Sequence, residues 1–120
     1  MAGVALQPEP EVLARHRDGA SIILQLRIPV DLIHFRGHFP GFPLLPGVVQ
    51  VDWAIRLARQ SFDLPENFRR LSALKFMRIL QPGAEVTLTL EQHNAGELRF
   101  RYQEKGQVCS SGRIVFSDAA

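Results

Sequence analysis

The hydrophobic and polar positions of this chain follow two different periods. Residues 21–29, SIILQLRIP, place apolar side chains at alternate positions, which is typical of a strand, and the strand would end at Pro29. Residues 48–62, VVQVDWAIRLARQSF, contain no glycine or proline, and their apolar residues recur at helical spacing, so they predict a helix that other structure surrounds. The apolar positions are Ile22, Leu24, Leu26 and Ile28 in the strand, and Val48, Val51, Ala54, Ile55, Leu57 and Ala58 in the helix.

Four runs of similar length follow the helix, at residues 71–80, 84–93, 97–105 and 107–118, with glycine-containing turns between them. Successive hairpins predict an antiparallel meander. One apolar face of such a sheet needs a cover, and the helix is the only candidate, so we expect an α+β fold in which the sheet curls around one long helix. Residues 11–18 fit either a short strand or a helical piece. The inward positions are Val86, Leu88 and Leu90, then Leu98, Phe100 and Tyr102, then Ile114 and Phe116.

The composition narrows the class of protein. With 120 residues we expect a single domain spanning 1–120, loosely ordered over 1–10. Fourteen basic and twelve acidic residues are too balanced to indicate nucleic-acid binding, and the few aromatics do not alternate with Lys or Arg. The single cysteine, Cys109, allows no internal disulfide, and no segment resembles a secretory signal or a membrane span. We therefore expect a cytoplasmic protein without membrane or nucleic-acid partners.

Residues 36–52, RGHFPGFPLLPGVVQVD, combine three glycines, three prolines and several large apolar residues. Pro46 and Gly47 come directly before the predicted helix, so unpaired backbone N–H groups would lie at Gly47 and Val48, at the positive end of the helix dipole. Such a helix start can hold an oxyanion or a polarised carbonyl, and glycine lets a ligand approach closely. The alternative is that Gly47 is only a turn residue.

His38 and Asp52 stand at the two ends of this stretch. His38 lies between apolar residues and would suit a general base, although a buried, hydrogen-bonded histidine is the plainer alternative. Asp52 lies on the predicted helix, where an ordinary ion pair with Arg56 one turn later is the alternative. His34 and His38 have a spacing that suits zinc only on a helix, and the glycines and prolines here argue against one.

The stretch GHFPGFPLLPGVVQVD resembles the signature of the FabA/FabZ family of β-hydroxyacyl-acyl-carrier-protein dehydratases. LKFMRILQPG resembles the family's strand ending in a Pro-Gly turn, and the resemblance covers about residues 20–117. The acid is Asp, as in the FabA branch, whereas the GHFPG context is closer to FabZ, and Trp53 stands where the family often has a small residue. PGVVQVDWA is most similar to the ApeI-like dehydratases of aryl-polyene-type pigment clusters. The matching positions are Gly37, His38, Phe39, Pro40, Pro43, Pro46, Gly47, Val48 and Asp52.

This resemblance implies a hot-dog fold and dehydration of a 3-hydroxyacyl thioester on acyl carrier protein to the trans-2-enoyl thioester. His38 would remove the C2 proton, protonated Asp52 would protonate the leaving hydroxyl, and the N–H groups at Gly47 and Val48 would bind the thioester oxygen. It implies no metal or other cofactor beyond the carrier's phosphopantetheine. The implied substrate tunnel is lined by Phe39, Pro40, Phe42, Leu44, Leu45 and Trp53.

The resemblance also implies a homodimer or a higher hot-dog assembly, with His38 of one subunit facing Asp52 of the other. Two alternatives are a hot-dog thioesterase, which would use the acid with water as nucleophile, and a non-catalytic subunit that pairs with an active partner. The product separates these functions: an enoyl thioester, a free acid, or nothing without a second protein.

Basic residues gather after the helix and along the next predicted strand. Because acyl carrier proteins are acidic, these side chains are candidates for a docking patch, and an ordinary solvated basic face is the alternative. The residues are Arg69, Arg70, Lys75 and Arg78, with Arg113 on the last strand.

Overall fold

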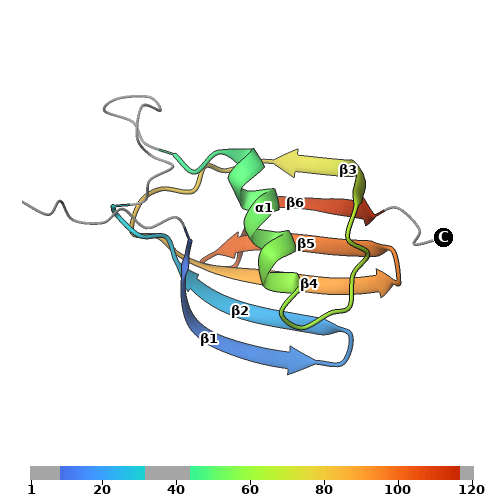
Figure 1. The fold of residues 1–120 in the computed structure, drawn as a ribbon. Helices are drawn as coiled ribbons and strands as arrows, with labels where there is room; N and C mark the ends of the chain where they lie inside the picture. The colour runs from blue at the N-terminus through green and yellow to red at the C-terminus, as the bar shows by residue number, and fades with distance from the viewer. Residues whose placement is uncertain (1–8, 32–43, 117–120) are drawn as a thin grey trace, which may run out of the picture.

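A computed structural model describes residues 9–31 and 44–116. Within these ranges, six strands form one antiparallel sheet in the order β1-β2-β4-β5-β6-β3, and one helix lies against it (Figure 1). The ambiguous residues 11–18 therefore form a strand. The elements are β1 (Glu11–Asp18), β2 (Ser21–Arg27), α1 (Gly47–Ala58), β3 (Phe68–Phe76), β4 (Glu85–Asn94), β5 (Glu97–Glu104) and β6 (Gln107–Phe116).

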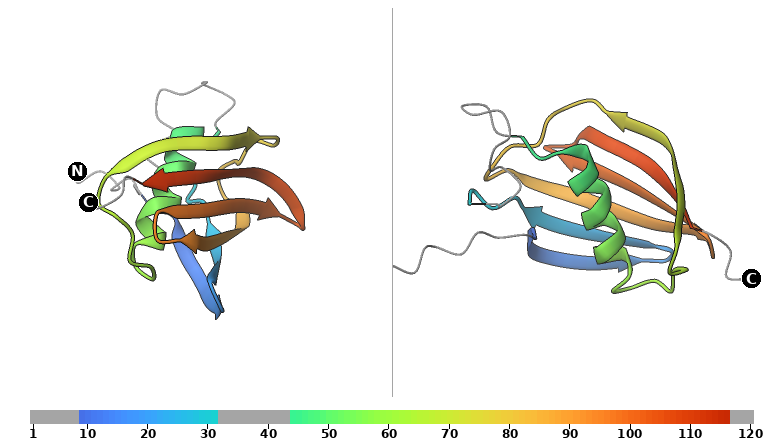
Figure 2. Two further views of the ribbon diagram at one scale, coloured as in Figure 1. Left: turned by 90° about the vertical axis from the view of Figure 1, so that its right-hand side faces the viewer. Right: turned by 45° about the horizontal axis from the view of Figure 1, so that its top comes forward.

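The predicted inward faces of the strands are confirmed. The sheet curls around α1 (Figure 2). The alternating apolar side chains of β2, β4, β5 and β6 are buried in the core together with those of the helix. Burial of these side chains supplies the main driving force for folding. The buried positions are Ile22, Leu24, Leu26, Val86, Leu88, Leu90, Leu98, Phe100, Tyr102, Ile114 and Phe116.

The predicted meander is correct only for β4, β5 and β6. Strand β3 pairs with β6 instead of β4, so the chain crosses the sheet after β3 and enters β4 next to β2. The turn at Pro82-Gly83 is present, but it bonds to the end of β2: Gly83 donates its N–H to the Ile28 carbonyl at 2.7 Å, and Ile28 donates to the Ala84 carbonyl at 2.9 Å. A Pro-Gly turn specifies a local bend and carries no information about which strand pairs next.

The helix α1 is shorter than predicted, and its buried face agrees only in part with the predicted stripe. Val51, Ala54, Leu57 and Ala58 are buried as predicted. It ends at Ala58, and residues 59–62 continue as turns. Val48, which we expected in the apolar stripe, is 77 % exposed, whereas Gln50, which we expected among the polar positions, is buried. The sheet covers only one side of α1, so an apolar residue on the other side stays exposed. The buried helix residues are Val49, Gln50, Val51, Trp53, Ala54, Leu57 and Ala58.

Strand β3 forms one edge of the sheet and is irregular. Its pairing with β6 shifts between Ser72 and Lys75, and Ala73 has a positive φ of 53°. The Leu74 side chain packs where a Cβ on Gly112 would stand, since such an atom would lie 2.5 Å from its Cδ2. The absence of a side chain at Gly112 therefore lets β3 close onto β6. Large apolar side chains are exposed along β3 and just after it, at Phe68, Leu74, Phe76, Met77 and Ile79.

No helix within residues 9–31 and 44–116 is both long enough and apolar enough to cross a membrane.

Candidate active site

A pocket of about 220 Å³ opens at the N-terminal end of α1. It lies between the start of the helix and the chain that leaves β3. Three residues predicted for the substrate and thioester site, Leu44, Leu45 and Gly47, line this pocket together. Arg78, which was predicted for carrier docking, lines it as well. The rest of the lining had no predicted site role and consists of Gln50, Phe76, Met77 and Ile79.

The start of α1 presents two backbone donors beside this pocket. Pro46 is the N-cap residue and makes no side-chain cap bond, and its carbonyl accepts the N–H groups of Val49 and Gln50, each at 3.1 Å. Within the described residues, the N–H groups of Gly47 and Val48 come before these bonds and have no helical acceptor. The helix dipole adds partial positive charge here. The geometry thus provides a place for a developing negative charge on an oxygen.

Gly47 is needed at this helix start for space. A Cβ at this position would lie 2.8 Å from the tip of the Phe76 ring, which covers the glycine from β3. Any other residue would displace the ring from the pocket. The absence of a side chain at Gly47 therefore lets the Phe76 ring lie close to the helix start and shapes the pocket.

Asp52 lies on the side of α1 that the sheet leaves uncovered. Its side chain is 57 % exposed, and its Oδ2 accepts a bond from Arg56 Nη1 at 3.3 Å. The ordinary ion pair that the spacing suggested is therefore present. Arg56 also bonds to Glu9. Asp52 does not line the pocket beside Gly47, and the described residues of this chain do not enclose its carboxylate.

Several predicted site residues lie outside the described residues: His38, Phe39, Pro40 and Phe42. Their proposed roles remain predictions. Trp53, predicted as a tunnel residue, is 1 % exposed, belongs to the hydrophobic core and does not line this pocket.

A buried polar cluster beside the pocket was missed at the sequence level. The Tyr102 hydroxyl donates to the backbone carbonyl of Gln50 at 2.7 Å. Burial raises the pKa of Tyr102, and the charge of Asp52 raises it further, so the hydroxyl remains protonated and can donate this bond. From the sequence, Tyr102 was assigned only to the apolar face of its strand. Its hydroxyl group needs a hydrogen-bond partner when buried, and this need was the signal that could have predicted the contact.

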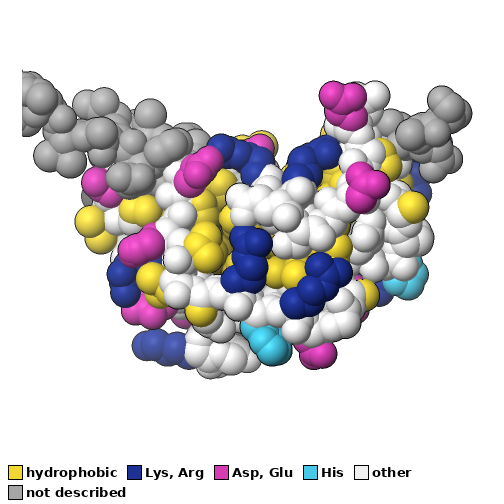
Figure 3. Space-filling view, turned by 60° about the horizontal axis from the view of Figure 1, so that its bottom comes forward, with side chains coloured by type: hydrophobic (Ala, Val, Ile, Leu, Met, Phe, Trp, Pro, Cys, Tyr) yellow, Lys and Arg dark blue, Asp and Glu magenta, His cyan; other side chains and the backbone are white. Residues whose placement is uncertain are grey.

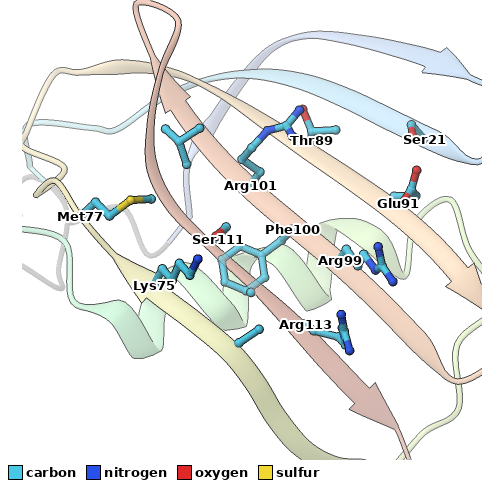
Figure 4. Close-up of a pocket in the computed structure, with 13 residues that line it drawn as sticks. Ser21, Lys75, Met77, Thr89, Glu91, Arg99, Phe100, Arg101, Ser111 and Arg113 are labelled. Carbon is cyan, nitrogen blue, oxygen red and sulfur yellow. The ribbon is translucent and has the colours of Figure 1, made fainter.

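The predicted basic patch is divided between two places. Lys75 and Arg113 line a hollow of about 700 Å³ on the sheet face that points away from α1, together with Arg99 and Arg101 (Figure 4). There Arg99 Nε donates to Glu97 Oε2 at 3.1 Å, and Arg113 Nε lies 3.3 Å from the same oxygen. Figure 3 shows Lys and Arg side chains beside exposed hydrophobic ones on a hollowed face of the molecule.

The other three basic residues lie nearer the pocket or on the edge strand. Arg78 lines the pocket beside Gly47, and Arg69 and Arg70 are exposed on β3. The five cations therefore do not form one continuous cluster. Arg99 and Arg101 were not among the predicted basic residues. They line the same hollow as Lys75 and Arg113 because alternate residues of adjacent strands share one face of the sheet.

The sheet wrapped around one helix, with a pocket at the glycine start of that helix, defines a hot-dog protein. The model of the ApeI-like family, described as ApeI dehydratase, matches residues 14–113. The chain therefore belongs to the ApeI-like dehydratase family, which confirms the resemblance and the fold stated above.

Individual relatives agree with this assignment. The chain is 34 % identical to a chain of the dehydratase heterocomplex ApeI:P from Xenorhabdus doucetiae, with a TM-score of 0.83, covering 92 % of this chain and 99 % of that one. It is 31 % identical to an uncharacterized protein from Erwinia carotovora subsp. atroseptica, with a TM-score of 0.78 and coverage of 92 % and 97 %. It is also 24 % identical, over 82 % of this chain and 74 % of the relative, to the 3-hydroxyacyl-[acyl-carrier-protein] dehydratase FabZ of Lactobacillus helveticus.

Proposed function

We propose that this protein dehydrates 3-hydroxyacyl thioesters carried on acyl carrier protein to trans-2-enoyl thioesters. The observation that carries the proposal is the uncapped start of α1, where the N–H groups of Gly47 and Val48 lie beside a pocket lined by Leu44 and Leu45. An enolate forms at the thioester when the C2 proton leaves, and preorganised N–H donors stabilise that charge. Membership of a dehydratase family supports the same reaction.

In this mechanism His38 takes the C2 proton, and the electron pair of the broken C–H bond forms the new double bond between C2 and C3. The C3–O bond breaks, and Asp52 transfers its proton to the departing oxygen, which leaves as water. Transfer of a proton from His38 back to Asp52 restores the starting state. The reaction therefore balances without an oxidant, a reductant or a cofactor other than the carrier's phosphopantetheine.

The position of Asp52 supports a site built from two hot-dog subunits. Its carboxylate lies on the helix face that the sheet leaves uncovered, next to Val48, which is a large apolar residue at 77 % exposure. The end of β3 beside this end of the helix exposes Phe76, and Met77 directly after the strand is also exposed. An open strand edge with exposed apolar residues favours pairing with another chain. We propose that a second subunit covers this region and encloses Asp52 opposite His38.

The second subunit is either another copy or a related chain. The similar structure from Xenorhabdus doucetiae is a dehydratase heterocomplex, so a subunit of a two-protein enzyme is the second candidate function. A pathway that builds aryl-polyene-type products would fit the family and belongs to the same proposal. For carrier docking we propose Arg69, Arg70 and Arg78, which are exposed on β3 or beside the pocket.

The test incubates the purified protein with a panel of 3-hydroxyacyl carrier proteins and follows the loss of water by mass spectrometry. Formation of the enoyl thioester supports the proposal, and His38→Ala should abolish it. Appearance of free acid and carrier thiol would identify a thioesterase instead. No reaction by the purified chain, with turnover only after a second hot-dog protein is added, would favour the subunit of a two-protein enzyme.

A further inference from the structure

Gln50 is the polar exception among the residues that α1 buries. Its side chain is 3 % exposed, and the other buried residues of the helix are apolar. A buried amide is unfavourable unless its donors and acceptors find partners. A leucine or methionine would fill similar space at less cost, so the amide has to be explained by what it binds.

Both ends of the Gln50 amide are engaged. Nε2 donates to the Leu45 carbonyl at 3.1 Å, and Oε1 accepts the Ser110 hydroxyl at 2.6 Å. Because a carbonyl can only accept, the nitrogen must face Leu45, and the orientation of the amide follows. Ser110 is fully buried in β6. One side chain thus connects the segment before the helix with a strand on the other side of the core.

Leu45 is held at both of its backbone polar groups. Its N–H donates to the Leu80 carbonyl at 2.8 Å, and its carbonyl accepts the Gln50 amide. Leu45 lies two residues before Gly47, and the intervening Pro46 has no side-chain cap bond. Gln50 therefore supplies a hydrogen bond that fixes the backbone immediately before the N–H groups of Gly47 and Val48, which have no helical acceptor. Gln50, Leu45 and Gly47 also line the same pocket.

We propose that Gln50 is a positioning residue for the dehydratase site. By holding the Leu45 carbonyl it orients the turn through Pro46, so that the N–H groups at the helix start point at the thioester oxygen. This inference rests on the proposed function of the site. Donors act on a transition state only when they are already in place, and small displacements reduce the rate more than they reduce binding.

The test compares Gln50→Met with Gln92→Met. Methionine keeps the approximate volume of glutamine and removes the amide. Gln92 offers a matched control because its Nε2 also donates to a backbone carbonyl, that of Asp63 at 3.0 Å, at a place remote from the pocket. For Gln50→Met we expect kcat to fall roughly tenfold to a hundredfold while KM changes less than about threefold. For Gln92→Met we expect both constants to stay near those of the wild type.

Amide hydrogen exchange provides a second readout that does not depend on turnover. In Gln50→Met the Leu45 amide should exchange faster, whereas the amide of Leu88 in β4 should not change. An unchanged kcat in the folded variant, or unchanged exchange at Leu45, would overturn the proposal. If Gln50→Met does not fold, Gln50→Asn serves instead, because it keeps an amide but is one methylene too short to reach both partners. If the wild type dehydrates no substrate, either alone or with a second hot-dog protein, the proposed function fails, and exchange at Leu45 alone decides whether Gln50 holds the turn.

Discussion

Replacing Asp52 by asparagine should separate catalysis from stability. The described contact of the Asp52 carboxylate is the exposed ion pair with Arg56 at 3.3 Å. Exposed pairs one helical turn apart contribute about 0.3–0.5 kcal/mol, so loss of this one should lower the melting temperature by only about 2 °C. Loss of a proton-transfer group reduces turnover by roughly 10²–10⁴-fold. The variant should therefore fold normally and be nearly inactive.

The measurement pairs a thermal melt with dehydration rates at several substrate concentrations. Arg56→Gln is the matched control, because it removes the same ion pair, together with the bond to Glu9, and keeps the carboxyl group. It should melt close to Asp52→Asn and retain most of the activity. Near-normal turnover by Asp52→Asn would refute the role of Asp52 as the acid. A fall of more than about 8 °C would show that the carboxylate holds structure that the exposed ion pair does not explain.

Three further predictions follow from the site and the fold. Mixing His38→Ala with Asp52→Asn subunits should restore part of the activity after exchange, and no recovery despite measured exchange would place both groups in one chain. Replacing Arg69 and Arg70 by glutamate should raise KM for carrier-bound substrate and affect a short pantetheine thioester far less; equal losses on both would indicate damage to the site. Gly112→Ala should lower stability by about 1–3 kcal/mol, since its Cβ would lie 2.5 Å from a leucine methyl and 2.7 Å from a buried phenylalanine ring, and an unchanged melt would contradict this packing.

The alternation of apolar residues predicted the inward faces of the sheet because a strand repeats every two residues wherever it lies. It could not predict that β3 joins β6, since pairing across the sheet depends on contacts far apart in the chain. The Pro-Gly turn before β4 gave no information on this point, because the same local bend serves a hairpin or a crossing.

The helix also shows that a local sequence pattern cannot predict contacts with distant parts of the chain. Its location and most of its buried stripe followed from the periodicity, but the periodicity misplaced Val48 and Gln50. Val48 is exposed and Gln50 is buried because Gln50 meets Ser110, sixty residues later in the chain. Gly47 and Asp52 were predicted from the motif at the helix start. The geometry of Gly47 supports its role, and the role of Asp52 remains a prediction.

The long-range hydrogen bonds around the helix start have a consequence for biosynthesis. Gln50 bonds to Ser110 in β6, and β3 also pairs with β6. During synthesis, α1 and β3 therefore leave the ribosome well before β6, the strand with which both of them interact. Contacts so distant in sequence form late and slowly, since a long loop must close first. The pocket beside Gly47 should thus be among the last parts of the protein to mature, and a ribosome-bound chain that stops short of β6 should hold an unformed site and an exposed, adhesive β3.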